Sequence, residues 1–185
     1  HTNHALLIFF ILHFLVYPSS NGYNSYMDRD ETPIGGIKKP MQPTVELFQT
    51  SIIMDLAAIA LSFIISYWFA FCIVAYIAAS RAYSYRGIRL KKHPVAGYLT
   101  VVIFQGSVTF FMVYHGSHIE KTLAVPPAGM VGAGLLIGGF YPLTQVYQHE
   151  ADRKDGVETI SSMLGYRGTF IFTAVVYTMA MSVLA

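Results

Sequence analysis

Charged residues and cysteine are both scarce in this 185-residue chain, and each scarcity excludes a class of protein. Only 12% of the residues are charged, about half of the share in an ordinary soluble domain, whereas 54% are hydrophobic. The mean hydropathy is +0.49. A single cysteine, Cys72, excludes an intramolecular disulfide and a cysteine metal cluster, so we expect it to be a packing residue. The composition indicates an integral membrane protein.

Long apolar segments dominate the sequence, and their lengths predict the number of membrane crossings. A helix that crosses the hydrocarbon core needs about 20 mostly apolar residues. Residues 46–80 are too long for one crossing at about 1.5 Å per residue, so we divide them near residues 62–66. The sequence therefore predicts an all-α transmembrane bundle with six spans, which are approximately 5–20, the two halves of 46–80, 95–114, 127–147 and 168–185.

Basic residues gather in alternate loops, which supports this division. Lys and Arg concentrate in short cytoplasmic loops of membrane proteins. With six spans, 11 of the 12 basic residues lie on one side, in loops 21–45, 81–95 and 149–167, and only Lys121 lies on the other. Treating 46–80 as one span would place the first two of these loops on opposite sides of the membrane. We expect these loops to face the cytoplasm, in a bacterial cytoplasmic membrane.

Two acidic segments follow apolar runs and lie in these basic loops. In the first, Asn24, Asp28 and Glu31 are four and then three residues apart, so a helix that continued inward would carry them on one face. The second segment repeats this spacing with Gln145, Gln148, Asp152 and Asp155. Glu150 falls on a different face unless the helix breaks, which Gly156 makes feasible.

Glycines and basic residues follow each acidic segment. Gly35, Gly36, Lys38 and Lys39 come after the first, and Arg153, Lys154 and Gly156 belong to the second. Carboxylates beside Lys and Arg suit a diphosphate neutralised by Mg²⁺, because the metal bridges protein and phosphate oxygens while the basic side chains take the remaining phosphate charge. The two segments predict one such site, provided that they meet at the same membrane surface.

The order of the motifs resembles the UbiA superfamily of intramembrane prenyltransferases. The resemblance covers nearly the whole chain, and it rests on Asn24-x-x-x-Asp28, on Tyr83-Ser84 with Arg89-Leu-Lys91, and on Asp152-Arg-Lys-Asp-Gly156-x-x-Thr159 with Leu164-Gly165. Family members are nine-helix bundles, so the resemblance implies that this chain carries helices two to seven. The chain also starts without Met and stops inside an apolar run. We therefore expect residues 1–185 to form a single transmembrane domain that is incomplete at both ends.

The resemblance implies transfer of a polyprenyl group from its diphosphate to an aromatic, quinone-precursor-like or other lipophilic acceptor, with Mg²⁺ as cofactor. The implied metal ligands are Asn24, Asp28, Glu31, Glu150 and Asp152. The implied diphosphate contacts are Lys38, Arg89, Lys91, Arg153 and Lys154, and the implied catalytic residues are Asp28, Asp152 and Tyr83. We expect membrane lipid as the surroundings, no nucleic-acid partner and no obligate protein partner.

Two positions depart from the family pattern. Ser25 and Gln148 stand where the family usually has Asp, so the leading carboxylate is missing from both motifs. Because Mg²⁺ needs only one or two protein carboxylates beside substrate phosphates, the remaining acids can still suffice. The alternative is a catalytically impaired homologue that binds isoprenoid lipids without turnover.

Asp55 is the one acid in the middle of a predicted span. An ionised carboxylate there is costly, so we expect Asp55 to face the bundle interior and to be paired or protonated. A transporter with Asp55 as its ion site is a third interpretation, but it requires inverted repeats and a broken mid-membrane helix, which the sequence does not show. We further expect the glycines of 129–139 to permit close helix packing and Pro142 to kink its helix.

Overall fold

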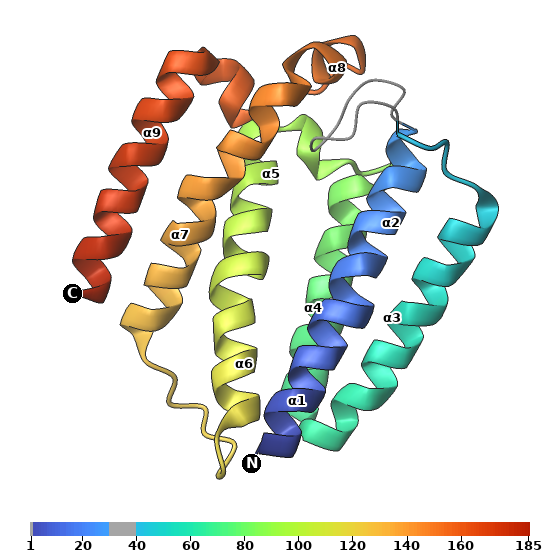
Figure 1. Ribbon diagram of the computed structural model, residues 1–185, viewed down its shortest axis with the longest axis vertical. Helices are drawn as coiled ribbons and strands as arrows, with labels where there is room; N and C mark the ends of the chain where they lie inside the picture. Colours follow the sequence, from blue (N-terminus) through green and yellow to red (C-terminus); the bar gives the residue numbers. More distant parts are fainter. Residues whose placement is uncertain (1, 30–39) are drawn as a thin grey trace.

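The computed structural model describes residues 2–29 and 40–185, and within these ranges every regular element is helical. The first crossing joins α1 (Thr2–Phe10), a π-helical segment (Ile11–Val16) and α2 (Tyr17–Asp28), and is followed by α3 (Val45–Ile65) and α4 (Tyr67–Ser84). The second half contains α5 (Pro94–Val101), a π-helical segment (Val102–Val108), α6 (Thr109–Ser117), α7 (Pro127–Gln145), a 3₁₀ turn (Val146–Gln148), α8 (His149–Lys154) and α9 (Ile160–Leu184) (Figure 1).

The predicted number of spans agrees with these helices. In the part of the chain that the structure describes, five continuous helices are long and apolar enough to cross a membrane: Thr2–Asp28, Val45–Ile65, Pro94–Ser117, Pro127–Lys154 and Ile160–Leu184. The sixth long helix, α4, has 18 residues and so a length of about 27 Å. The protein is thus an integral membrane protein with an all-α bundle.

The boundary between α3 and α4 lies at Ser66, at the edge of the predicted range. Ser66 has extended backbone, and its Oγ accepts a hydrogen bond from the Phe69 N–H at 3.0 Å, which caps α4. The same hydroxyl lies 2.7 Å from Nε2 of His115, whose Nδ1 lies 3.0 Å from the Thr122 carbonyl. The carbonyl can only accept, so Nδ1 donates to it, and Nε2 hydrogen-bonds with the Ser66 hydroxyl. His115 is buried and has a structural role.

The described parts of the three basic loops lie at one end of the bundle. In Figure 1 the ends of α2, α4 and α7 and the starts of α3, α5 and α9 lie at the top, together with α8. The N-terminus, the turn between α3 and α4 and the loop after α6 lie at the bottom. Both acidic segments therefore share one end, as the charge pattern predicts.

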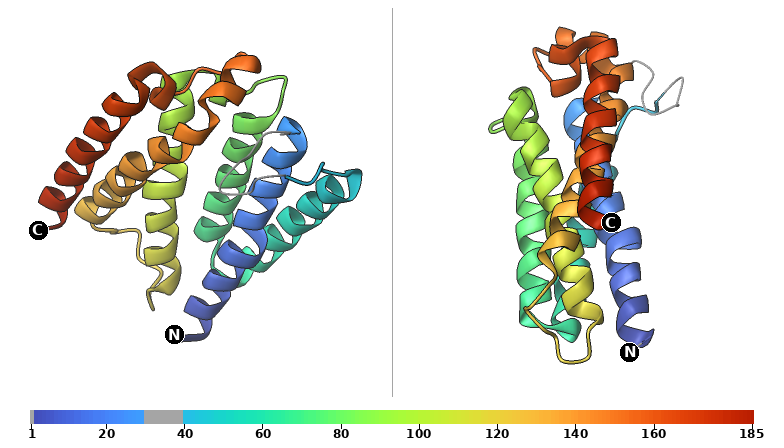
Figure 2. Two further views of the ribbon diagram at one scale, coloured as in Figure 1. Left: turned by 45° about the horizontal axis from the view of Figure 1, so that its top comes forward. Right: turned by 90° about the vertical axis from the view of Figure 1, so that its left-hand side faces the viewer.

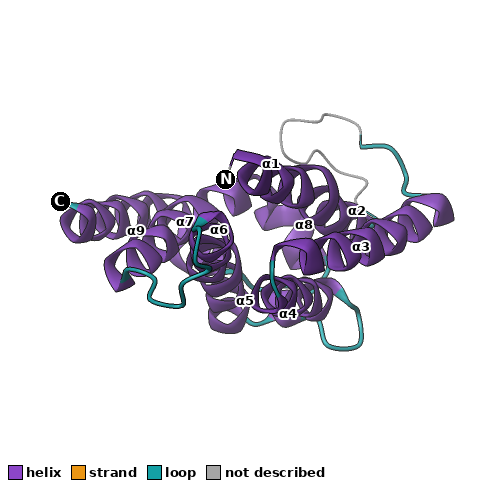
Figure 3. Ribbon diagram, turned by 90° about the horizontal axis from the view of Figure 1, so that it is seen from below, coloured by secondary structure: helices purple, strands orange, loops and turns teal. Residues whose placement is uncertain are grey.

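The helices form an elongated cross-section, with α9 on one flank and α3 on the other (Figures 2 and 3). A buried core joins α1, α4 and α6 through Ile8, Phe69, Ile73 and Met112. Cys72 belongs to this core, which confirms its packing role. On the other side α7 packs against α9, where the Thr173 hydroxyl donates to the Gly139 carbonyl at 2.9 Å.

Glycines allow α7 to approach its neighbours, as predicted. A Cβ added at Gly106 would lie 2.6 Å from the Cα of Gly134, so these two backbones are in direct contact. Gly138 faces the Tyr98 hydroxyl, and Gly139 faces the ring of Tyr177. Small residues at these positions allow α7 to pack closely against α5, the π-helical segment Val102–Val108 and α9.

We expect Gly106→Ala to destabilise the protein by about 1–3 kcal/mol, the usual cost of forcing extra volume into a packed interior. The added methyl group would meet the backbone of Gly134, which cannot rotate away. Gly168→Ala is the matched control, because the nearest atoms there belong to a Leu164 side chain of the same helix. Thermal unfolding in detergent measures both; equal stabilities would contradict the role assigned to Gly106.

The last helix begins earlier than predicted. Thr159 caps α9, since its hydroxyl accepts from the Ser162 N–H at 3.1 Å and its own N–H donates to the Ser162 hydroxyl at 2.8 Å. The helix starts at Ile160, not near 168, and Gly165 interrupts it with a φ of 66° that favours glycine. Because the residues before Gly165 include several polar ones, the sequence analysis did not assign them to the last helix.

Candidate functional site

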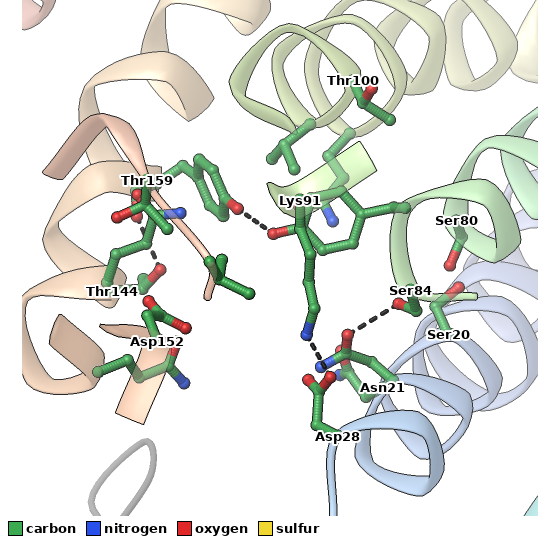
Figure 4. Close-up of a pocket in the computed structure, with 18 of the residues that line it drawn as sticks. Ser20, Asn21, Asp28, Ser80, Ser84, Lys91, Thr100, Thr144, Asp152 and Thr159 are labelled. Atoms are coloured by element: carbon green, nitrogen blue, oxygen red, sulfur yellow. Dashed lines mark hydrogen bonds and ion pairs between the residues drawn. The ribbon is translucent and has the colours of Figure 1, made fainter. Parts of the chain in front are cut away.

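A cavity of about 540 Å³ opens at the end of the bundle where the acidic segments meet. Asn24, Asp28, Tyr83, Lys91, Asp152 and Lys154, all predicted from the sequence, line it. Figure 4 shows Asp28, Lys91 and Ser84 on one side of the open space, with Asp152, Thr144 and Thr159 on the other. Aromatic and apolar side chains complete the wall, among them Tyr76, Val101, Phe104 and Tyr141. The central prediction, that the two segments lie at one site, agrees with this geometry.

The first wall is the last turn of α2. The helix continues past the predicted membrane boundary to Asp28, so Asn24 and Asp28, four residues apart, both reach the cavity. Arg29 follows with a φ of 52°, in the left-handed region, and ends the helix. The Ser84 hydroxyl donates to Oδ1 of Asn24 at 2.7 Å, which joins α4 to α2. Glu31 and Lys38, the other candidates of this segment, lie outside the described residues.

The second wall is a continuous helical face. Gln145, Gln148, Asp152 and Asp155 all line the cavity, as their spacing predicts. The regular helix changes to a 3₁₀ turn at Val146–Gln148 and resumes as α8, and Gly156, with a φ of 64°, follows its end.

Two implied residues of this segment are not part of the cavity. Glu150 and Arg153 are both exposed, and neither is among the described residues that line the cavity. The helix does change its winding before Glu150, but this change does not turn the side chain inward. The cavity is lined instead by Asp152 of α8 and by Asp155, which follows the helix, so the roles implied for Glu150 and Arg153 stay predictions.

Asp28 is held between two cations from the loop after α4. The Lys91 ammonium donates to Oδ1 of Asp28, and Nη2 of Arg89 lies 3.8 Å from the same oxygen. Arg89 also donates to the Asp155 carboxylate of the second wall. Arg89 has a φ of 49°, so the left-handed backbone at this residue directs the loop toward the acids. Lys91 thus lines the cavity, whereas Arg89 is not a lining residue but contacts the lining acids Asp28 and Asp155.

Tyr83 reaches across the cavity to a partner that the sequence analysis did not select. Its hydroxyl hydrogen-bonds to that of Tyr141, which comes from α7. Tyr141 precedes Gln145 by four residues and therefore extends the 145, 148, 152 and 155 series by one helical turn. Continuing that series toward the membrane would have identified it.

The cavity fits a hydrated Mg²⁺ whose ligands would be protein oxygens, water and the phosphate oxygens of a substrate. Among residues 2–29 and 40–185, no three His, Cys, Asp or Glu side chains come together as a metal site. Asn24 and Asp28 on one wall, and Gln148 and Asp152 on the other, nevertheless present oxygen donors to one space. Mg²⁺ commonly keeps several waters and uses one or two carboxylates beside phosphate oxygens, so this donor set fits it.

Asp55 is not among the cavity-lining residues and belongs to a largely buried polar cluster formed by Ser19, Asp55 and Arg81. Arg81 of α4 forms an ion pair with Asp55 of α3, and the Ser19 hydroxyl of α2 lies 2.5 Å from Oδ1 of Asp55. The Arg81 guanidinium also lies over the Tyr23 ring, 4.0 Å from its centroid. The expectation that Asp55 faces the interior and is paired is confirmed. Its partner is a fixed cation of the protein, which argues against an ion-transport site.

Comparison with known proteins identifies one family. The model of the UbiA prenyltransferase family matches residues 1–185. A search of curated proteins and a search of solved structures both return no match.

Proposed function

The chain belongs to the UbiA prenyltransferase family, and on this basis we propose that it transfers a polyprenyl group from a prenyl diphosphate to a lipophilic acceptor of the aromatic, quinone-precursor type. The observation that carries the proposal is the cavity at the end of an apolar bundle, which gathers Asp28, Lys91, Asp152 and Lys154. Acids for a metal and cations for a diphosphate are thereby present in one space.

The diphosphate would occupy the polar part of this cavity. Lys91 and Lys154 bring positive charge from two different segments, and Arg89 adds charge behind Lys91. Asn24 and Asp28 on one wall and Gln148 and Asp152 on the other would hold Mg²⁺, which supplies charge neutralisation on the departing diphosphate. Fixed charges that face the leaving group stabilise the negative charge that develops there.

The aromatic part of the cavity suits the prenyl group. In the reaction the bond between the allylic carbon and the diphosphate oxygen breaks with its electrons on oxygen, and the acceptor then bonds to that carbon and releases a proton. Tyr76, Tyr83, Phe104 and Tyr141 line the cavity. Aromatic faces stabilise a desolvated cation by up to about 2 kcal/mol, so they would favour the allylic cation.

In this proposal the cavity opens toward the cytoplasm. Among residues 2–29 and 40–185, every basic residue except Lys121 belongs to the segments at this end, the bias that marks cytoplasmic loops. Prenyl diphosphate would then bind with its headgroup at the cytoplasmic surface and its hydrocarbon chain among the helices, in what we take to be a bacterial cytoplasmic membrane.

The proposal is tested with purified protein in detergent, Mg²⁺, prenyl diphosphates of several lengths and a panel of hydroxylated aromatic acceptors. We expect pyrophosphate release and a prenylated product, both abolished by EDTA and restored by Mg²⁺. Acceptor-dependent release distinguishes transfer from hydrolysis. If no combination yields product or pyrophosphate, the protein is not an active prenyltransferase.

A second candidate is a homologue that binds isoprenoid diphosphates without turnover, favoured by the absence of Asp at Ser25 and Gln148. Gln148 lines the cavity, whereas Ser25 is not among its lining residues. Gln148→Asp would therefore add a carboxylate to the site, and Ser25→Asp would not. Diphosphate binding without product, even after both substitutions, would support this candidate.

A further inference from the structure

Two of the cations at the cavity, Lys91 and Arg89, are already paired with acids of the protein. Lys91 pairs with Asp28, and Arg89 pairs with Asp155 while lying 3.8 Å from Asp28. The side chains of Arg89, Asp28 and Lys91 are only 7%, 10% and 11% exposed, but that of Asp155 is 48% exposed. Three of the four charges are thus shielded from water, and the fourth is not.

This difference in exposure decides what happens when a diphosphate arrives. Phosphate oxygens would take the places of carboxylate oxygens on Lys91 and Arg89, since both are anionic acceptors for the same donors. Asp155, released from Arg89, can be hydrated. Asp28, released from Lys91, has a side chain that is only 10% exposed, and a carboxylate so shielded from water is unfavourable without a counter-charge. Asp28 therefore needs a new cation at the moment when Lys91 turns to the phosphate.

We propose that Asp28 and Asp155 stand in for the diphosphate on Lys91 and Arg89 in the ligand-free protein, so that metal ion and diphosphate bind as a unit and each binds weakly alone. The inference rests on the proposed function. A metal ion alone must compete with Lys91 for Asp28, and a diphosphate alone must leave Asp28 unpaired. When both bind together, the metal ion pairs with Asp28 and the diphosphate pairs with Lys91 and Arg89. The metal ion then does not compete with Lys91, and Asp28 is not left unpaired.

Calorimetric titration of the detergent-solubilised protein with Mn²⁺ and inorganic pyrophosphate tests this coupling. We expect saturating pyrophosphate to tighten Mn²⁺ binding by about tenfold or more, after correction for the complex of the two in solution, a coupling within the usual range for linked sites. By reciprocity Mn²⁺ must tighten pyrophosphate binding by the same factor.

Two substitutions with matched controls identify the residues responsible. Asp155→Asn frees Arg89, so pyrophosphate alone should bind several-fold more tightly; Glu158→Gln removes the same charge from an exposed position outside the lining residues and should have a smaller effect. Lys91→Gln frees Asp28, so Mn²⁺ alone should bind about tenfold more tightly. Lys92→Gln, at an exposed neighbouring position, is its control.

The outcomes separate this inference from the proposed function. Binding of Mn²⁺ and pyrophosphate without mutual coupling, or equal effects of Asp155→Asn and Glu158→Gln, would overturn the inference and leave the diphosphate site intact. Failure of the unaltered protein to bind pyrophosphate even with Mn²⁺ would overturn both. If Lys91→Gln does not fold, the Asp155 comparison decides, because that side chain is half exposed.

Discussion

Asp152→Asn is expected to lower the rate of prenyl transfer by about a hundredfold or more, on the scale of removing one preorganised charge-stabilising group from an active site. Asp152 is the carboxylate that the second motif retains beside Gln148, and both line the cavity. The substitution preserves the shape of the side chain and removes its charge, so the loss should come from weaker metal binding. Steady-state kinetics over a range of Mg²⁺ concentrations measures it.

Glu150→Gln is the matched control for this prediction. Glu150 lies two residues from Asp152 in α8 and is exposed outside the lining residues. The resemblance to UbiA proteins implies a metal ligand there, whereas the structure predicts less than about a twofold effect, in the range of a screened surface charge. If Glu150→Gln lowered the rate of prenyl transfer as much as Asp152→Asn, Glu150 would belong to the site. Partial recovery of Asp152→Asn at high Mg²⁺ would support a role in metal binding.

The sequence predicted the site where helical geometry alone determines position. Asn24 and Asp28, and the series from Gln145 to Asp155, keep spacings of three and four residues, so one helical face carries them to the cavity wherever the helix continues. The alternation of basic loops then specified that both faces meet at one end of the bundle. These inferences need only the period of a helix and the thickness of a membrane.

Contacts between segments were beyond such reasoning. The pairing of Arg89 with Asp155 depends on a left-handed residue in the loop after α4, and no periodicity indicates where that loop turns. Tyr141 was missed because a tyrosine in an apolar segment is not a distinctive signal, although its spacing of four residues from Gln145 fits the series. Likewise, Asp55 was predicted to be paired, but the identity of its partner, Arg81, depends on how α3 and α4 pack.

Removing one partner of the Asp55–Arg81 pair should have the largest effect on stability. We expect Asp55→Leu to lower the free energy of unfolding by about 3–5 kcal/mol, because the Arg81 guanidinium, whose side chain is only 17% exposed, would lose its counter-charge. Asp55 accepts from Nε of Arg81 at 3.1 Å, and Nη2 of Arg81 donates to the Ser19 hydroxyl at 2.8 Å. The cluster joins α2, α3 and α4, and Ser19 and Arg81 are next in sequence to the cavity-lining Ser20 and Ser80. Thermal unfolding in detergent, with ligand binding as a second measurement, reports the change.

The double variant Asp55→Leu/Arg81→Met tests whether the charge itself is responsible. A buried ion pair replaced by apolar side chains of similar volume is often neutral in stability, so the double variant should recover most of the loss. If it is as unstable as Asp55→Leu, the defect comes from packing of the leucine and not from an unpaired cation. A stable double variant with weakened diphosphate binding would show that the cluster also positions the ends of α2 and α4, which carry Asn24, Asp28 and Tyr83 to the cavity.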